Sequence, residues 1–583
     1  MKKKITHAVI ICVIIPVLLT IFTCPLQALT RGQMISEILD TLNIPVSANF
    51  SNFSDVSTNH PFFRHIETAR AMGIIYPGER FHPDMEATVA ETVFFALRTM
   101  GLEHEAMLIK HFRNYQRENI PLYINPYLTL SEIMDPPLPG DLMKSMTEDL
   151  SEESLYRVVK WINKCKSNLQ WELELGENPI KAVIFREGIG RPSGQWAIRI
   201  AEFETLENAQ KELRRFISTG EKAYIEQDIC SYAVCSGPFN HYESAWNKYQ
   251  ILNRKYDCSL VPASSFYSRA LFWAGLRIDP RAIQPEIITA PSISGYKLPL
   301  SWISEYTKAY GAINGGYYYK NRPVGSLVID RTPSSSPLSY RSAFGWNSEG
   351  DIAFGNGNFR CRVKTDAGPV NVTTFNSPPS SNGASIYTPD FVNYATGIPK
   401  DSREFLIKED QLYEIRDSSR SNHFVPRKGF ILVSRGSATK RLNSLKTGYK
   451  LDISIDWADS KMKDTTDVIQ GGPMLIKDGI LCLNNEGLPE NFTHKPHPRT
   501  IVASDGYYLW FFVFDGRNPW HSRGVTLKEA GQILIDMGML HALNLDGGGS
   551  TEMIWHNRII NMPSGGIERP LPYAVIIKGQ GRS

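Results

Sequence analysis

The stretch Asn544-Leu545-Asp546-Gly547-Gly548-Gly549-Ser550-Thr551-Glu552-Met553 follows an apolar, strand-like approach and holds three consecutive glycines between two carboxylates. Consecutive glycines cost backbone entropy on folding and give no side chain to a core. They predict either a sharp turn whose N–H groups approach a ligand, or a flexible turn that is merely rich in glycine. In the first case Asp546 lies at the mouth of the loop, beside amide donors suited to an anion.

Eight further motifs precede and follow this loop, and four of them set an apolar run against glycine with a polar residue alongside. They lie at residues 312–318, 341–345, 386–389, 470–479, 497–503, 512–517, 561–564 and 568–569. The ordered series resembles the phosphodiester glycosidase family, which includes the lysosomal enzyme that removes N-acetylglucosamine from phosphomannosyl glycans. The resemblance implies a catalytic domain of mixed α/β, α+β type, which we place at residues 285–580.

Hydrolysis of a sugar-1-phosphodiester requires a phosphate-binding group, a carboxylate near the anomeric carbon, and a general acid or base. The resemblance implies catalytic roles for Asp546, Asp515 and Glu552. Arginine side chains and glycine N–H groups can bind phosphate oxygens. The predicted substrate-binding residues are Asn314, Gly315, Gly316, Gly471, Gly472, Arg499, Arg517, Gly547, Gly548, Gly549 and Ser550.

Each charged residue also has a structural interpretation. Arg499 and Arg517 could pair with Asp515 or Asp546 as structural ion pairs. Asp515, which precedes a glycine, could belong to a hairpin turn. Glu552 could face outward on the segment that follows the glycine loop.

Composition describes a globular chain of several domains. The 583 residues, 42% of them hydrophobic and 21% charged, favour three or four domains. A net charge of +3 gives no electrostatic basis for a nucleic-acid partner. No Cys/His spacing typical of zinc is present, and no metal or other cofactor is assigned, although Asp546 and Asp515 could hold a divalent cation with Glu552. Cys258 could form a disulfide with Cys230 or Cys235 in an oxidising compartment, or all three could remain thiols.

Residues 1–29 resemble a secretory signal peptide. Three lysines at positions 2–4 precede an apolar run over residues 8–22, and Ala28 provides a small residue for cleavage. The alternative is an uncleaved anchor, although the run is short for a membrane span. We expect no stable membrane span after cleavage.

Residues 30–102 resemble S-layer homology sequence and predict a small helical domain. The pattern includes residues 53–56, 60–63 and 81–84, with helical spacing at Ile66, Ala69 and Gly73. Barely one and a half repeats are visible, so a helical domain packed on its neighbour is the alternative to wall anchoring. Residues 103–186 form a connecting region with no predicted fold.

Residues 187–268 show two strand–helix–strand units and resemble a SPOR domain of ferredoxin-like α+β type. That family binds peptidoglycan glycan strands stripped of their peptides. A plain interaction domain is the alternative, because many ferredoxin-like units share this order without the ligand.

Together these features predict a secreted glycosidase of the cell envelope or periplasm that hydrolyses sugar-1-phosphodiester or related linkages in an envelope glycan. Peptidoglycan strands are the second expected partner, through the SPOR-like segment. The alternative is a non-catalytic envelope protein that binds peptidoglycan or exopolysaccharide without cleaving it.

Overall fold

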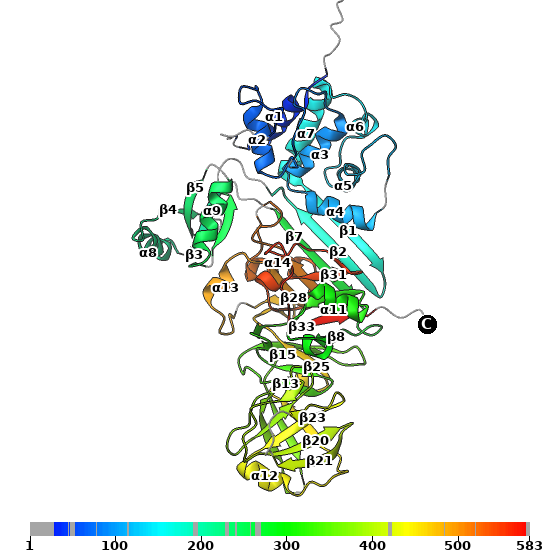
Figure 1. The fold of residues 1–583 in the computed structure, drawn as a ribbon, viewed down its shortest axis with the longest axis vertical. Helices are drawn as coiled ribbons and strands as arrows, with labels where there is room; N and C mark the ends of the chain where they lie inside the picture. Colours follow the sequence, from blue (N-terminus) through cyan, green and yellow to red (C-terminus); the bar gives the residue numbers. More distant parts are fainter. Residues whose placement is uncertain are drawn as a thin grey trace, which may run out of the picture.

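The computed structural model describes most of residues 28–578, which form an elongated molecule (Figure 1). The gaps within this range are residues 45, 47–52, 77, 114–115, 191–195, 204, 228–231, 240–241, 257, 263–269, 366, 418–422, 483 and 519. All but the last two residues of the expected signal peptide lie outside the described residues. Helices form one end of the molecule and β-sheets the other (Figure 1). The chain is a mixed α+β protein of several domains.

The helical unit at the N-terminal end comprises α1 to α7. Their bounds are Arg31–Thr41, Phe63–Ala71, Val89–Thr99, Glu103–Phe112, Asn125–Ile133, Gly140–Lys144 and Glu152–Asn168. Thr30 and Thr88 begin α1 and α3 with capping boxes, which satisfy N–H groups that the first helical turn leaves open. Helices α5 and α7 pack on α3, so the helical unit continues well past residue 102. Its identity as an S-layer homology domain stays a prediction.

An eight-stranded antiparallel sheet forms the centre of the molecule. Its order is β1-β2-β7-β29-β28-β30-β26-β27. In the same order the bounds are Gln170–Glu177, Ile180–Glu187, Leu271–Ile278, Leu509–Phe514, Arg499–Ser504, His541–Asn544, Met474–Lys477 and Ile480–Leu481. Strands from before residue 285 thus pair directly with strands of the expected catalytic domain. One apolar cluster runs from the helical unit into this sheet, so the two share a core.

Helix α14 (Leu527–Asp536) contributes Leu527, Ala530 and Leu534 to a second cluster that packs on the central sheet. Thr526 caps this helix with a complete capping box. The described strands of the central sheet are therefore packed against apolar side chains from both the helical unit and α14.

Two five-stranded sheets adjoin the central sheet. One has the order β32-β31-β9-β33-β8, with bounds Arg558–Ile559, Met553–Trp555, Gly311–Asn314, Tyr573–Ile577 and Glu286–Thr289. The short helices α10 (Ala290–Ile293) and α11 (Leu300–Thr307) accompany it. The other has the order β13-β12-β25-β14-β15, with bounds Thr332–Ser335, Leu327–Ile329, Asp467–Gln470, Ser342–Trp346 and Ile352–Asn356.

A seven-stranded sheet forms the end of the molecule opposite the helical unit (Figure 1). Its order is β21-β20-β23-β18-β17-β16-β24, with bounds Gln411–Asp417, Arg403–Lys408, Gly429–Ser434, Ala384–Tyr387, Val370–Phe375, Phe359–Lys364 and Asp452–Trp457. It shares an apolar cluster with β12, β14, β25 and helix α12 (Gly436–Leu442). The remaining short elements are β10 (Tyr318–Tyr319), β11 (Arg322–Pro323), β19 (Tyr394–Ala395), β22 (His423–Phe424), η1 (Ser460–Met462) and α13 (Glu490–His494).

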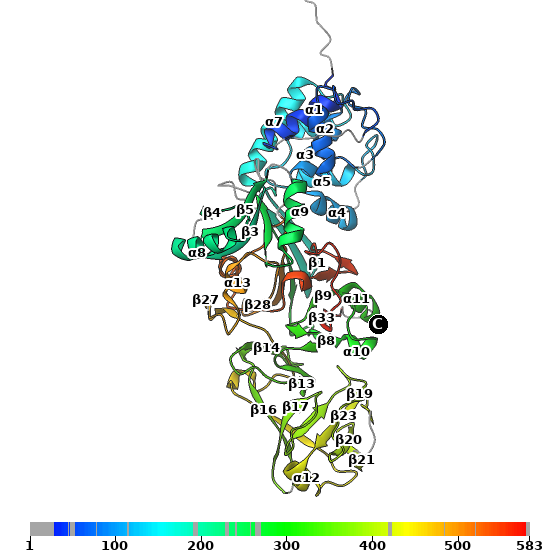
Figure 2. The ribbon, with the colours of Figure 1, turned by 60° about the vertical axis from the view of Figure 1, so that its left-hand side comes forward.

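A separate middle domain lies beside the central sheet (Figure 2). Its strands are β3 (Trp196–Phe203), β4 (Ala223–Gln227), β5 (Tyr232–Phe239) and β6 (Ser259–Pro262), with helices α8 (Leu206–Ile217) and α9 (Tyr242–Leu252). The antiparallel order β4-β5-β3-β6 is that of a ferredoxin-like unit. The domain has its own core, and its identity as a SPOR domain stays a prediction.

Neither proposed disulfide to Cys258 is present among the described residues. Cys235 and Cys258 are both thiols, and Cys230 lies outside the described residues. Cys235 is buried in the middle of β5, where its Sγ lies 3.6 Å from Glu226 Oε2. None of the described helices is long and apolar enough to cross a membrane.

Candidate functional site

The glycine loop joins the central sheet to the sheet that contains β9. It leaves β30 after Asn544, forms the short helix η2 (Gly548–Ser550) and enters β31 at Met553. Asn314, at the end of β9, holds the loop: its Nδ2 donates to the carbonyl of Asp546 at 2.7 Å. Its Oδ1 accepts from Thr500 Oγ1 at 2.8 Å and from the N–H of Glu552 at 3.3 Å. Asn314 is fully buried, so the structure gives it a role in shaping the loop rather than in touching a ligand.

Two carboxyl groups at the ends of this loop have strongly raised pKa values. Burial raises the pKa of Asp546 to about 6, although contacts with Ser550 and the charge of Arg569 oppose the rise. Burial raises the pKa of Glu552 to about 8, against a backbone hydrogen bond from Arg569. Glu552 is 0% exposed, and among the described residues its Oε2 has no hydrogen-bond partner. Groups with such pKa shifts are common at catalytic sites. Burial brings the pKa of a carboxyl group near neutral pH, where the group can both release and accept a proton.

Arg569 connects the two carboxyl groups and is absent from the predicted site. Its N–H donates to Glu552 Oε1 at 2.6 Å, and its Nη1 lies 3.4 Å from Ser550 Oγ. A Cβ at Gly549 would overlap the Arg569 guanidinium, so this guanidinium lies directly against the glycine. The side chain is exposed, so it can meet an anion from solvent. The Glu568-Arg569 pair was part of the family resemblance, and this was the signal that could have identified it.

Arg517 lies on the other side of the loop. A Cβ at Gly548 would come within 3.3 Å of Arg517 Nη2, so this guanidinium packs directly over the glycine. Its Nη2 also lies 3.3 Å from His497 Nδ1. The side chain is partly exposed. Arg517 and Arg569 therefore place two cationic groups against consecutive glycines of one loop, as expected of an anion site.

Arg499 is placed differently from the prediction. Its Nε donates to the carbonyl of Val525 at 3.2 Å, and its Nη2 donates to the carbonyls of Phe492 and Lys495. The guanidinium also lies 4.7 Å from the centre of the Phe492 ring. Because Arg499 is fully buried beneath α13, these contacts describe a structural arginine that ties α13 to β28.

Asp515 is also placed differently from the prediction, because it does not share the environment of Asp546. It is 1% exposed, and both of its carboxylate oxygens have partners. Oδ2 accepts from His521 Nε2 at 2.8 Å and from the N–H of Met562 at 2.6 Å. Oδ1 accepts from Asn561 Nδ2 at 2.8 Å. These contacts place Asp515 under the site as a structural carboxylate.

Several predicted glycine amides are engaged within the protein. The N–H groups of Gly471 and Gly472 donate to the carbonyls of Ser342 and Asn544, at 3.0 and 2.8 Å. The N–H of Gly548 likewise donates to a backbone carbonyl. The prediction that these three amides bind phosphate is therefore corrected: their hydrogen bonds fix the loops.

Gly315 and Gly316 make room for an aromatic ring. A Cβ at Gly315 would overlap the ring of Tyr573, and one at Gly316 would come within 2.8 Å of its hydroxyl. Tyr573 is buried, and burial together with the nearby charge of Asp546 raises its pKa. The glycine pair thus brings Tyr573 toward the loop, a contact that the sequence did not reveal.

Tyr317 and Arg341 complete the surroundings of the loop and were absent from the predicted site. Tyr317 Oη donates to the carbonyl of Gly472 at 2.8 Å and accepts from Asn544 Nδ2 at 2.7 Å. The Arg341 guanidinium lies 5.1 Å from the centre of the Tyr317 ring. Burial and the charge of Asp546 raise the pKa of Tyr317, while the charges of Arg499 and Arg341 oppose the rise. Arg341 therefore places a cationic side chain beside Tyr317.

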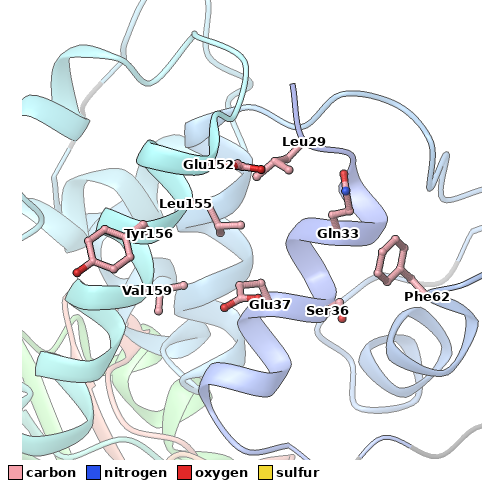
Figure 3. Close-up of a pocket in the computed structure, with 9 residues that line it drawn as sticks. All are labelled: Leu29, Gln33, Ser36, Glu37, Phe62, Glu152, Leu155, Tyr156 and Val159. Atoms are coloured by element: carbon pink, nitrogen blue, oxygen red, sulfur yellow. The ribbon is translucent and has the colours of Figure 1, made fainter. Parts of the chain in front are cut away.

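One pocket lies away from this loop, between α1 and α7 (Figure 3). Its volume is about 370 Å³, and its lining includes Leu29, Phe62, Leu155 and Val159. Within the described residues, no group of three or more His, Cys, Asp or Glu side chains could hold a metal ion.

Solved structures with a similar fold include a Burkholderia pseudomallei K96243 protein described as exported. It has a TM-score of 0.52 and 15% identity, over 71% of this chain and 97% of that one. A hypothetical protein from Synechocystis has a TM-score of 0.44 and 18% identity, over 70% and 76%. The catalytic domain of zebrafish N-acetylglucosamine-1-phosphodiester alpha-N-acetylglucosaminidase, auto-inhibited by its pro-peptide, has a TM-score of 0.32 and 15% identity, over 55% and 80%.

No curated protein matches the chain. The glycine loop and the residues Asp546, Glu552 and Arg569 lie within a segment that matches a family model. Residues 402–578 match the model of the phosphodiester glycosidase family.

Proposed function

We propose that the protein hydrolyses a sugar-1-phosphodiester or a related glycan linkage at the loop between β30 and β31. The observation that carries the proposal is the pair of buried carboxyl groups, with pKa values of about 6 for Asp546 and about 8 for Glu552. The match of residues 402–578 to the phosphodiester glycosidase family supports the same chemistry.

The two pKa values assign different roles to the carboxyl groups. At neutral pH Asp546 is mainly ionised, and its negative charge can stabilise an oxocarbenium-like transition state or attack the anomeric carbon. Glu552 is mainly protonated, so it can donate a proton to the oxygen that leaves. Separate pKa values in one site are the usual basis of such a division between acid and base.

Arg569 and Arg517 supply the positive charge that a phosphodiester requires. Their guanidinium groups lie against Gly549 and Gly548, with no Cβ between them and the loop. A planar guanidinium group can bind two oxygens of one phosphate at the same time. This contact forms when the substrate binds, before any bond is broken. The arginines therefore act in substrate binding, while the carboxyl groups act in the chemical step.

The test is release of a free sugar from a sugar-1-phosphate diester by purified protein. Asp546→Asn should lower kcat by roughly 10²-fold or more with little change in KM, because the lost charge acts in the transition state. Arg569→Ala should raise KM as well. The matched control is Asp478→Asn, which removes a mostly exposed carboxylate 3.7 Å from His541 Nε2 and should leave both constants unchanged.

The pH profile gives a second readout of the same assignment. The value of kcat should rise as Asp546 ionises near pH 6 and fall as Glu552 loses its proton near pH 8. Folded Asp546→Asn protein with the wild-type rate would contradict the assignment. Binding of the diester without turnover by the wild-type protein would support a glycan-binding role instead.

We also propose that the protein is secreted and acts at the cell envelope. The basis is the signal-like sequence of residues 1–29 and the fold shared with a protein described as exported. The N–H of Leu29 donates to the carbonyl of Leu150 at 2.8 Å, so the residue that follows the expected cleavage point is bound to the helical unit. Protein isolated from the envelope should begin near Leu29; a mature chain that still starts at Met1 would contradict this.

Peptidoglycan strands are the proposed partner of the middle domain, because its strand order fits the SPOR-like sequence pattern. Full-length protein should sediment with peptidoglycan stripped of its peptides and less with intact peptidoglycan. If the protein is found in neither pellet, the middle domain does not bind peptidoglycan and serves only as a spacer.

A further inference from the structure

A continuous chain of buried polar contacts runs from helix α4 to the two residues that flank Glu552, at the start of β31. We propose that Glu105, on α4 of the helical unit, is a positioning residue for Glu552. The helical unit is then part of the catalytic assembly, although it lies outside the segment that matches the glycosidase family. This inference rests on the proposed function, since Glu552 is the proposed proton donor.

The first part of the chain is a cluster of four buried charged groups. Glu105 Oε1 lies 3.4 Å from Arg186 Nη1 and 3.5 Å from His521 Nδ1. His521 Nε2 lies 2.8 Å from Asp515 Oδ2. Nε2 of His521 therefore faces a carboxylate, and Nδ1 lies beside both Glu105 Oε1 and Arg186 Nη1, the latter 3.4 Å away. With an imidazolium at His521, the two carboxylates are balanced by two cations in a site with almost no exposure to water.

The pKa directions agree with this charge balance. Burial alone would lower the pKa of His521, but the hydrogen bonds to Asp515 and Glu105 outweigh it and raise the pKa. Burial opposes ionisation of Glu105, yet Arg186 and His521 lower its pKa to about 2. His104, whose ring centre lies 4.9 Å from that of His521, faces the same cluster. Burial and the charge of His521 lower the pKa of His104, which keeps it neutral.

The second part of the chain reaches the backbone on both sides of Glu552. Asp515 Oδ1 accepts from Asn561 Nδ2 at 2.8 Å. Asn561 Oδ1 accepts from the N–H of Met553 at 2.8 Å, and its Nδ2 donates to the carbonyl of Thr551 at 3.1 Å. Thr551 and Met553 are the two neighbours of Glu552, so Asn561 fixes the peptide groups from which the Glu552 side chain projects.

Helix α4 also contacts the same segment directly. His104 Nε2 lies 3.2 Å from the carbonyl of Ile560, the residue before Asn561. Asp515 Oδ2 accepts from the N–H of Met562, the residue after it. Three consecutive residues, 560–562, are thus held by α4 or by the carboxylate that α4 orients. This segment leads to Arg569, whose N–H donates to Glu552.

The chemical step is sensitive to this support because burial sets the protonation of Glu552. A small displacement of its backbone changes how much water reaches the carboxyl group and where its proton is offered. Removal of the Glu105 charge leaves an excess of buried positive charge next to His521 and weakens the His521–Asp515–Asn561 chain.

The experiment compares Glu105→Gln with Glu103→Gln in the full-length protein. Both residues lie on α4, but Glu103 is half exposed and pairs with Arg98 and Tyr76. Glu105→Gln should lower kcat by about tenfold or more, with less than about a twofold change in KM, and shift the alkaline limb of the pH profile. Glu103→Gln should change none of these, and Glu105→Asp should restore part of kcat because it keeps the charge.

A readout without substrate separates this inference from the proposed function. Hydrogen exchange in the peptide that spans residues 550–562 should be about tenfold faster in Glu105→Gln than in wild type or Glu103→Gln, because the Met553 N–H loses its support. If wild-type protein releases no sugar, the proposed function fails while this comparison still tests the positioning chain. Folded Glu105→Gln with wild-type exchange there would overturn the inference.

A double-variant cycle covers the case in which Glu105→Gln folds poorly. Residues in one network have non-additive effects, so Glu105→Asp combined with Asn561→Ser should lower kcat little more than the Asn561 change alone. Effects that multiply independently would mean that Glu105 and Asn561 act separately, and would overturn the inference.

Discussion

The helical unit and the middle domain are attached to the central sheet in different ways. The helical unit continues into the hairpin β1–β2, which adds two strands to the sheet, and shares an apolar cluster with it. The middle domain has its own core and meets the rest of the protein through a stack of Trp196 on Trp520, with ring centres 5.7 Å apart. Lys495 Nζ also donates to the carbonyl of Ile200 at 2.8 Å.

Both attachments converge on neighbouring residues. Trp520 contacts the middle domain, and His521 joins the buried charges that reach α4. A Cβ at Gly101 or Gly190 would overlap the Trp520 carbonyl, so both glycines permit its close approach. A unit that shares strands and buried charges with the central sheet becomes part of the same fold, whereas a unit with its own core and a small contact can keep separate stability.

The largest expected effect comes from Arg186→Met, which tests the integral attachment. Removal of one partner from a buried ion cluster should lower the free energy of unfolding of the whole protein by about 3–5 kcal/mol. The matched control is Lys181→Met on the same strand, where a partly exposed pair with Glu174 should contribute about 0–1 kcal/mol. Urea unfolding measures both; similar small losses would mean that the cluster does not bind the units together.

Acidification should separate the two attachments without any substitution. The folded pKa of Glu105 is about 2, below its ordinary value of 4.5, so its contribution is present above pH 4.5 and is lost as pH falls toward 2. The shift corresponds to stability on the order of 3 kcal/mol. His521 has the opposite sign: its raised pKa stabilises the fold below pH 6.5 and the effect fades at higher pH.

The measurement is urea unfolding across this pH range, followed separately in the two regions by hydrogen exchange. Protection of α4 should fall in acid before that of α8. Loss of protection in both regions at the same pH would contradict the proposed difference.

The smallest effect on the rest of the protein is expected from Trp196→Leu, which tests the attachment of the middle domain. The change removes the aromatic stack, worth about 0.5–1.5 kcal/mol, and leaves a cavity in the core of the middle domain, where Trp196 is 4% exposed, so unfolding of that domain should lose about 2–4 kcal/mol. The loss should be confined to unfolding of the middle domain, while sugar release keeps its wild-type kcat. A tenfold fall in kcat would show that the middle domain is as integral as the helical unit.

The sequence predicted the glycine loop and its carboxyl groups because their chemistry is local. Asp546, Glu552 and the three glycines lie within ten residues, and the structure confirms that they share one loop. The mixed α+β character of the catalytic domain followed from the family resemblance, and the strand–helix–strand units of the middle domain followed from local periodicity. Local sequence patterns predict single helices and strands, but they say little about which distant residues pack against those elements.

The partners of Asp515 and Arg499 could not be predicted for that reason. Asp515 and Asp546 both follow apolar strands, β29 and β30, and look equivalent in sequence. The structure distinguishes them because His521 and Asn561 cover Asp515. Glu105, which completes the cluster, lies more than 400 residues earlier in the chain, a separation that no local pattern can bridge.

The pairing of β7 with β29 determines how the protein behaves when its amino-terminal half is removed. Strand β29 reads Leu-Trp-Phe-Phe-Val-Phe over residues 509–514, and β7 from residues 271–278 covers one of its edges. A fragment that begins at residue 285 would lack β7 and expose this edge, which combines high β-propensity with no charge. Such a fragment would form aggregates by edge-to-edge strand addition, so the amino-terminal half acts as a built-in protection against self-association.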